Sequence, residues 1–287
     1  MQKACRLKYL NLLGFEPLSN RENSEKMLEA SFFLEKLSLS GIHLSSKLIS
    51  NISFQNGTTL KVLDLSRCTF CRIENNCTYA SYACLKDSNC TSDVPIKQIV
   101  ENCTELKELN LSSTELCEKS VEFLVCNLTS KIEKLSLFWI PLLRDKHIKT
   151  LVTRCNKMTE LNLGGQTSIT RHSLNFVIEH LQSTLVKLSL QSSKVVLDSN
   201  DFFKLKSMEK LKMLGYYKQK DPVNMQMMQK MLPNLQIDFH TDNIRIASPN
   251  WVMGSEMEDH HGFWEINAEA EESKFCKKRE HLGFRRS

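Results

Sequence analysis

The sequence predicts an α/β leucine-rich-repeat solenoid of about eight or nine repeats, a right-handed horseshoe with a concave parallel sheet and outer helices. Three observations lead to this fold class. The motif LxxLxL recurs along the 287-residue chain, its spacing stays near 26 residues, and helical patterns fill the intervals. A fixed period headed by this motif is the signature of the class. Each such unit buries its apolar face only against its neighbours.

Seven copies of the motif carry apolar residues at its first, fourth and sixth positions. They are Leu7/Leu10/Leu12, Leu34/Leu37/Leu39, Leu60/Leu63/Leu65, Leu106/Leu109/Leu111, Ile132/Leu135/Leu137, Met158/Leu161/Leu163 and Leu185/Leu188/Leu190. Successive copies begin 27, 26, 46, 26, 26 and 27 residues apart, so the interval of 46 holds one repeat of 26 and an insertion of 20. A weaker eighth copy is expected at Met208/Leu211/Met213, and a degenerate ninth begins at Leu235.

Each motif predicts a short strand, and the segment after it predicts a returning helix. Side chains alternate along a strand, so the fourth and sixth positions face the core while the third, fifth and seventh face the concave surface. Apolar residues at helical spacing occupy the intervals, as in residues 120–128 and 145–155. Cys103 and Cys155, each three residues before the next motif, are expected to be small buried core residues.

The outward third positions predict a row of charges across the sheet. They are Lys36, Val62, Glu108, Lys134, Glu160, Lys187 and Lys210. Parallel strands lie about 4.8 Å apart, so the alternating signs from Glu108 to Lys187 can neutralise one another. The row could also be a docking stripe. Because the signs cancel, mutual neutralisation is the favoured interpretation.

The repeats suggest a domain over residues 1–242 with an insertion loop at about 66–93. Residues 243–287 form a C-terminal tail, expected to be packed back in part and disordered at its end. Cys68 and Cys71 in the insertion have the spacing of metal ligands. The second such pair is missing and the repeat itself accounts for Cys68, so neither a metal nor a cofactor is expected.

Composition excludes several classes of function. The net charge of +5 shows no clustered basic stripe, so nucleic acid is not an expected partner. No apolar run approaches the ~20 residues that span a bilayer, and no secretory signal is present. Catalytic motifs are missing, so the chain is not expected to be an enzyme. The odd number of cysteines, 11, argues against a disulfide framework. We therefore expect the nucleus or cytoplasm, with reduced cysteines.

Residues 110–163 resemble the central repeats of the F-box/leucine-rich-repeat proteins, and residues 231–250 resemble the end of their last repeat and the start of their tail. The resemblance implies a non-catalytic substrate-recognition subunit of an SCF-type ubiquitin ligase. No F-box precedes Leu7, so the other ligase subunits are expected as partners only if an F-box lies upstream. The alternative is a ligase-independent interaction scaffold or inhibitor that uses the same concave face.

The family binds an accessory protein through bulky or charged residues just after successive strands. The corresponding residues are taken to be Ser113, Pro141, Gly165 and Ser192, none of which offers an aromatic face or an ion pair. Exposed aromatic clusters mark interaction sites, and here they are expected after the fifth and eighth strands.

The predicted partner is therefore a protein, acidic or phosphorylated, bound by aromatic anchors beside unpaired lysines. A rival interpretation is that the tail's own acidic stretch, residues 256–272, covers this site. The candidate partner-binding residues are Phe138, Trp139, Lys187, Lys210, Lys212, Tyr217 and Trp251.

Overall fold

The structure is a computed structural model. It describes residues 7–12, 32–42, 44–70, 93–216 and 222–238.

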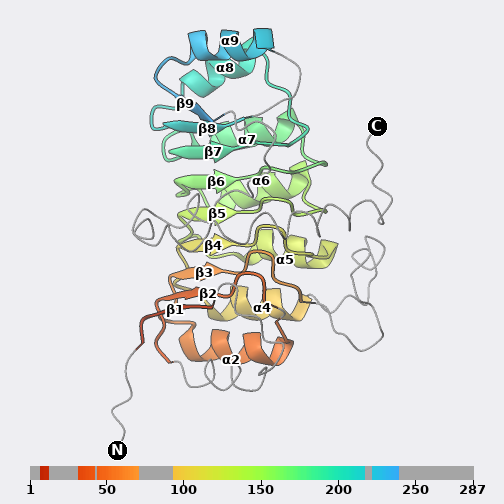
Figure 1. The fold of residues 1–287 in the computed structure, drawn as a ribbon, viewed down its shortest axis with the longest axis vertical. Coiled ribbons are helices and arrows are strands. Elements are labelled where there is room, and N and C mark those ends of the chain that lie inside the picture. The colour runs from red at the N-terminus through yellow and green to blue at the C-terminus, as the bar shows by residue number, and fades with distance from the viewer. Residues whose placement is uncertain (1–6, 13–31, 43, 71–92, 217–221, 239–287) are drawn as a thin grey trace, which may run out of the picture.

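Nine strands form one sheet in which every neighbouring pair is parallel and the spatial order follows the chain from β1 to β9 (Figure 1). The strands are β1 (Tyr9–Asn11), β2 (Lys36–Ser38), β3 (Val62–Asp64), β4 (Glu108–Asn110), β5 (Lys134–Ser136), β6 (Glu160–Asn162), β7 (Lys187–Ser189), β8 (Met213–Gly215) and β9 (Gln236–Asp238). An open parallel sheet with a helix in each crossover from β2 to β9 confirms the leucine-rich-repeat solenoid.

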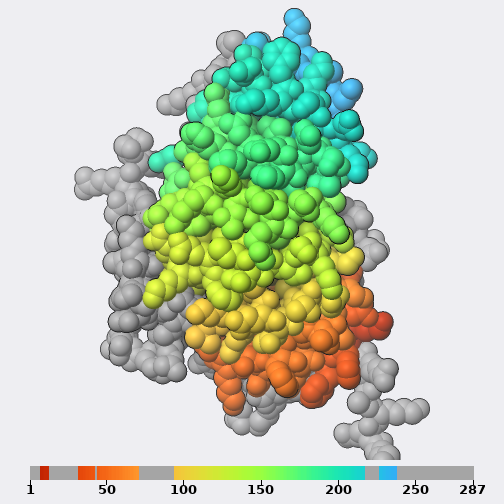
Figure 2. Space-filling model, turned by 180° about the vertical axis from the view of Figure 1, so that it is seen from behind, coloured from red at the N-terminus to blue at the C-terminus, as the bar shows by residue number. Residues whose placement is uncertain are grey.

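Helices return the chain between strands and pack beside one another on one side of the sheet (Figure 1). The described helices are α2 (Ser46–Asn56), α4 (Asp93–Asn102), α5 (Glu118–Asn127), α6 (Asp145–Arg154), α7 (Arg171–Leu181), α8 (Ser199–Lys206) and α9 (Pro222–Met231). Viewed from behind, the repeats follow one another in chain order along the long axis (Figure 2). None of these helices is long and apolar enough to cross a membrane.

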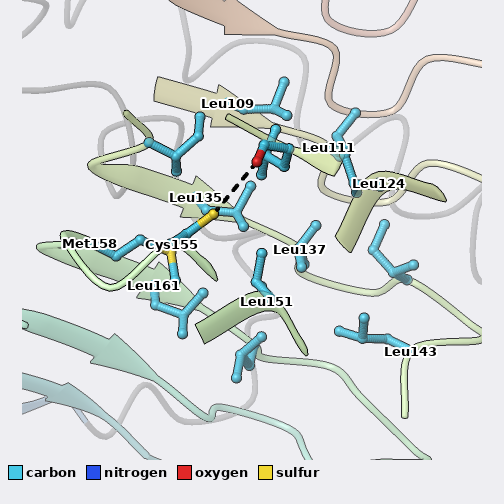
Figure 3. Close-up of a cluster of buried hydrophobic side chains, with 14 of the residues drawn as sticks. Leu109, Leu111, Leu124, Leu135, Leu137, Leu143, Leu151, Cys155, Met158 and Leu161 are labelled. Atoms are coloured by element: carbon cyan, nitrogen blue, oxygen red, sulfur yellow. Dashed lines mark hydrogen bonds between the residues drawn. The ribbon is translucent and has the colours of Figure 1, made fainter. Parts of the chain in front are cut away.

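The core lies between the sheet and the helices and consists of the motif residues together with the inward-facing apolar residues of the helices and turns. Leu109, Leu135 and Leu161 occupy the same position on three adjacent strands and are fully buried (Figure 3). Cys103 and Cys155 are buried too, which confirms their predicted role in the core. Burial raises the pKa of Cys155 to about 11, so its thiol stays protonated at neutral pH.

The insertion leaves the sheet after a residue that also belongs to the core. Cys68 is fully buried, and its thiol donates to the carbonyl oxygen of Leu39 at 2.9 Å. This agrees with the repeat explanation for Cys68 and leaves it unsuited to a surface metal site. Cys71, with residues 71–92 of the insertion, lies outside the described residues, as does the tail from residue 239.

The eighth strand corrects the predicted register. Met213 pairs with Lys187 and Leu214 with Leu188, so the motif positions are Leu211, Leu214 and Tyr216. They begin 26 residues after Leu185, and the regular period continues. The predicted alignment placed Met208, which is buried where α8 turns toward β8, at the first motif position.

The ninth strand differs from the prediction in the same way. Ile237 pairs with Leu214 and therefore holds the fourth motif position. Leu235 lies two residues before it, so Leu235 is not the first motif residue.

Candidate protein-binding surfaces

The face of the sheet turned away from the helices, the sheet surface, carries the predicted row of charges. Lys134 Nζ lies 3.2 Å from the Glu108 carboxylate and 3.8 Å from that of Glu160. Lys187 Nζ lies 3.4 Å from the same Glu160 oxygen. The four charges therefore neutralise one another across β4 to β7, which confirms the structural interpretation of the row.

Glu160 is the centre of this row and is nearly buried. Loss of hydration disfavours its charged form and raises its pKa, although Lys187 and Lys134 oppose that shift. Because one carboxylate serves both lysines, Lys187 at the end of the row is only partly compensated. Beyond it, at the same position on β8, stands the neutral Met213.

The fifth motif positions form a second row of short polar side chains. Ser38 Oγ donates to Asp64 Oδ2 at 3.2 Å, and burial raises the pKa of Asp64. Further along, Asn162 Oδ1 accepts from the backbone N–H of Gly164 at 3.0 Å. Two buried atoms of this row, Asn162 Nδ2 and Ser189 Oγ, have no hydrogen-bond partner within the part of the chain that the structure describes. An unsatisfied buried group costs about 1–3 kcal/mol, so an added hydrogen bond here would be favourable.

A third row follows the strands, where the chain turns with positive φ. Its members are Gly41, Arg67, Ser113, Trp139, Gly165 and Ser192, with φ between +54° and +79°. The backbone N–H of Ser113 donates to Phe138 O at 2.7 Å, and that of Trp139 to Gly164 O at 3.0 Å. The row is therefore continuous, and it corrects one assignment. The position after the fifth strand is held by Trp139, not by Pro141, so an aromatic face is present there.

Phe138 and Trp139 form a stacked pair, in which Trp139 belongs to this row and Phe138 directly precedes it. Their ring centroids lie 5.6 Å apart at an interplanar angle of 15°. A Cβ on Gly164 would lie 2.8 Å from Phe138 Cδ2, and a Cβ on Gly165 would overlap the Trp139 indole. Glycines in the next repeat thus make room for both rings. Phe138 is only 4% exposed, so its predicted role as an exposed anchor is wrong, whereas Trp139 is half-buried.

The predicted lysines do not form one site. Lys187 lies on the sheet surface, but Lys210 and Lys212 precede β8 and lie exposed at the N-terminal edge of the sheet. Trp139 follows β5 and lies at the opposite edge. The error comes from the shifted register of the eighth motif, which had placed Lys210 in line with Lys187.

Of the two aromatic residues predicted after the eighth strand, the structure describes only Tyr216. Tyr216 is buried at the sixth motif position, where its hydroxyl accepts from the backbone N–H of Leu197 at 3.2 Å. Tyr217 and Trp251 lie outside the described residues. Of the predicted partner-binding residues that the structure describes, Lys187 on the sheet surface and Trp139 at its C-terminal edge keep some exposed area on this side, while Lys210 and Lys212 are exposed at the N-terminal edge.

The sequence analysis missed several exposed apolar residues, and two of them lie on neighbouring helices. Phe203 on α8 is 62% exposed and Met227 on α9 is 44% exposed. The sequence alone does not distinguish Phe203 from the buried Phe202 beside it, because adjacent helix residues such as Leu151 and Val152 can both be buried.

The described residues contain no group of three or more His, Cys, Asp or Glu side chains placed to hold a metal ion. No family model matches the sequence. Among solved structures, the chain is similar to a chain of the yeast Rad7 and Elc1 complex. The TM-score is 0.43 at 15% identity, over 80% of this chain and 70% of that chain. A similarity this distant carries no argument about function. The fold itself defines a leucine-rich-repeat protein.

Proposed function

We propose that this chain is a protein-binding subunit that recognises substrates for an SCF-type ubiquitin ligase and catalyses no reaction itself. The ligase assignment rests on the resemblance of residues 110–163 to F-box/leucine-rich-repeat proteins. Within that family the repeats are most similar to those of the S-phase kinase-associated F-box protein. The same resemblance favours work in the cell cycle and a location in the nucleus or cytoplasm.

The observation that carries the binding role is the open sheet surface of nine parallel strands. A solenoid of this kind offers an extended surface to a partner. The partner would lie across β5 to β7, where Trp139 supplies an aromatic contact and Lys187 a partly compensated charge. Asn162 Nδ2 and Ser189 Oγ lie between them and lack hydrogen bonds to any described residue. A polypeptide could supply these bonds once side chains above them move.

The correction to Lys210 and Lys212 changes the expected partner. On the sheet surface the charges of β4 to β7 cancel, so this surface gives little preference for a strongly acidic segment. We propose instead that it takes a polypeptide with few charges and one apolar side chain next to Trp139. An acidic or phosphorylated partner requires the lysines at the sheet edge.

The test is capture of partners by the full chain from cells, followed by mass spectrometry. Trp139→Ala and Lys187→Gln should each reduce the captured set, while Arg154→Gln should not. Arg154 is a matched control because it is exposed on α6, away from the sheet. Thermal melting of each variant must match the parent, so that loss of capture reports on binding. Equal capture by all variants would contradict the proposed surface.

Ligase membership is tested separately with the same bait, extended upstream if the natural reading frame continues there. Co-purification of a cullin scaffold, and proteasome-dependent loss of captured partners, are expected for a ligase receptor. Partners captured without any cullin, and unaffected by proteasome inhibition, would instead establish the ligase-independent scaffold.

A further inference from the structure

The last two described helices expose apolar side chains on their outer face. Phe203 and Met227 are both more than 40% exposed, at 62% and 44%. The two helices, α8 and α9, pack side by side at one end of the solenoid (Figure 1). They form the cyan and blue end of the molecule in Figure 2. This location is separate from the sheet surface.

Elsewhere on the helix side, contacts between neighbouring helices follow a repeated pattern. Lys97 Nζ of α4 lies 5.5 Å from the ring centroid of Phe123 on α5. Lys149 Nζ of α6 lies 5.4 Å from the ring centroid of Phe176 on α7. In each pair a cation from one helix covers an aromatic ring on the next, so apolar area is shielded from water.

The positions of these residues within their helices are equivalent. Lys149 directly follows the buried Ile148, and Phe176 directly precedes the buried Val177. In the last pair of helices the same two places are taken by Phe203, which follows Phe202, and by Met227, which precedes Met228. We infer that Phe203 faces Met227. In this pair of helices two apolar side chains then meet, whereas the pairs α4–α5 and α6–α7 have a lysine over a phenylalanine ring at that place. Neither Phe203 nor Met227 is covered in that way.

Lysines border this pair of apolar residues. Lys206 lies three residues after Phe203, and Lys230 three residues after Met227, so each shares a helix face with its apolar neighbour. The exposed lysines of this end are Lys204, Lys206, Lys210, Lys212 and Lys230. Among the described residues no carboxylate lies within 4.0 Å of any of them. We call Phe203, Met227 and these five lysines the α8–α9 patch.

Helix dipoles account for only part of this arrangement. Lysines in the last turn of a helix are favourable, which explains Lys204, Lys206 and Lys230. Dipoles do not explain Lys210 and Lys212, which lie beyond α8, or the two exposed apolar side chains. An exposed apolar pair with lysines on the same helix faces suits an acidic segment that carries aromatic residues.

We propose that the chain's own residues 256–272 dock on the α8–α9 patch. This segment contains seven acidic residues and no lysine or arginine, with Phe263 and Trp264 near its middle. Aromatic side chains lose free energy when left in water, and Phe203 and Met227 offer them an apolar contact. The segment thus complements the patch in both charge and hydrophobicity.

The connection between patch and segment is short enough for docking within one chain. β9 ends at Asp238, next to β8, so the chain continues from the same end of the solenoid. The 17 residues from 239 to 255 can span at most roughly 56–61 Å. A tethered segment has an effective concentration of order millimolar, so even a small contact is populated. Two apolar side chains fall far short of the ~800 Å² per partner of a stable dimer, which argues against a second copy.

The test is zero-length carbodiimide crosslinking of the full chain, which joins a carboxylate to a lysine in direct contact. Links from Glu265, Glu269, Glu271 and Glu272 should concentrate on Lys206 and Lys230. The double variant Phe203→Ser/Met227→Ser should lower their yield about tenfold, corresponding to about 1.4 kcal/mol. Val196→Ser is the matched control, because Val196 is also exposed but lies outside the patch.

A charge exchange makes the test independent of folding. Lys206→Glu/Lys230→Glu should abolish the links, and adding Glu269→Lys/Glu272→Lys should restore links between the same two regions. Links spread over distant exposed lysines such as Lys131 and Lys157, or centred on Lys187, would overturn the proposal. So would links between isotopically labelled and unlabelled chains, or no links from this segment at all.

Discussion

The central repeats and the two ends of the solenoid are built from the same motif but differ in how completely they bury it. Leu161 on β6 is fully buried, whereas Leu7, the first motif residue of the first repeat, remains 42% exposed. At the other end, Phe203 and Met227 remain uncovered. The charges differ in the same way. Those of β4 to β7 pair across strands, whereas Lys210 and Lys212 have no carboxylate partner among the described residues.

This difference shows that the motif does not confer burial by itself. A motif leucine is covered by the strands and helices of the repeats before and after it, and at each end the described residues supply only one of these neighbours. The same applies to the aromatic residues. Phe138 is covered because Gly164 in the next repeat admits its ring. The following predictions test whether position in the stack, rather than residue type, sets the energetic cost of a change.

The largest effect is expected for a charge placed in the central core. Leu161→Asp should destabilise the domain by roughly 4 kcal/mol or more, because it buries an unpaired carboxylate. Leu10→Asp in β1, at a half-buried motif position, should cost only about 1 kcal/mol. Chemical denaturation followed by circular dichroism measures both. Equal losses would show that the first repeat is as integral to the fold as the sixth.

Glycines with positive φ provide a closer comparison. Gly165→Ala should cost roughly 2–4 kcal/mol, because backbone strain adds to an overlap between the new methyl group and the Trp139 indole. Gly41→Ala carries the same kind of strain at φ +79°, with nothing within 4 Å of the added Cβ, and should cost about 1–2 kcal/mol. Tryptophan fluorescence should change in the first variant only. Similar losses in the two proteins would argue against close contact between Trp139 and Gly165.

A buried histidine in the centre predicts a dependence on pH. His147 on α6 is buried, its Nδ1 accepts from the backbone N–H of Arg144 at 3.1 Å, and its Nε2 has no hydrogen-bond partner in the described ranges. Burial lowers its pKa, with Lys146 and Arg144 acting in the same direction and Glu122 and Glu118 opposing.

The unfolded state therefore takes up the proton first as the pH falls. The free energy of unfolding should decrease from about pH 6.5 down to the lowered pKa of the folded state. His147→Asn retains a hydrogen-bond acceptor and should remove this component, while His172→Asn, at an exposed position on α7, should leave it. Parallel pH profiles for the parent and His147→Asn, measured by denaturation between pH 5 and 8, would be inconsistent with a buried neutral imidazole.

The smallest effects concern two glutamates that each serve two lysines. Glu35, half-buried near the first strands, lies 2.7 Å from Lys8 and 2.9 Å from Lys61, and these cations lower its pKa to about 2. Glu160 in the centre has a raised pKa because it is buried. Opposite shifts predict opposite pH dependences for the two carboxylates.

Relative to Glu35→Gln, the parent should lose stability as the pH falls from about 4.5 toward 2, because the unfolded carboxylate protonates first. Relative to Glu160→Gln, it should lose stability as the pH rises above about 4.5, by less than ~1 kcal/mol, because ionising the buried group is unfavourable. High salt should weaken the Glu35 effect more strongly. Denaturation at pH 3, 4.5 and 6 measures the difference in free energy of unfolding between the parent and each variant. Differences that change with pH in the same direction for both glutamates would refute the contrast.

The sequence by itself determined the fold and nearly all of the core. The period of 26 residues placed Leu109, Leu135 and Leu161 in register, and the structure pairs them so. It also indicated the charge row from Glu108 to Lys187. These features depend on the spacing of residues along the chain, which fixes their register in a stack of similar repeats. The prediction failed where shifted matches were accepted, at Met208 against the regular interval that leads to Leu211, and at Leu235 in the ninth motif.

The tertiary structure alone decided which side chains are available on the surface. Phe138 and Tyr216 are buried. Trp139 belongs to the row of turn residues with positive φ that follow the strands. Lys210 lies on a different surface from Lys187. Exposure depends on what stands opposite in the neighbouring repeat, about 26 residues away, and on the exact register between the two. A strand shifted by three residues keeps its apolar pattern in part, yet every outward residue changes place. The core tolerates that ambiguity in the sequence, and a binding surface does not.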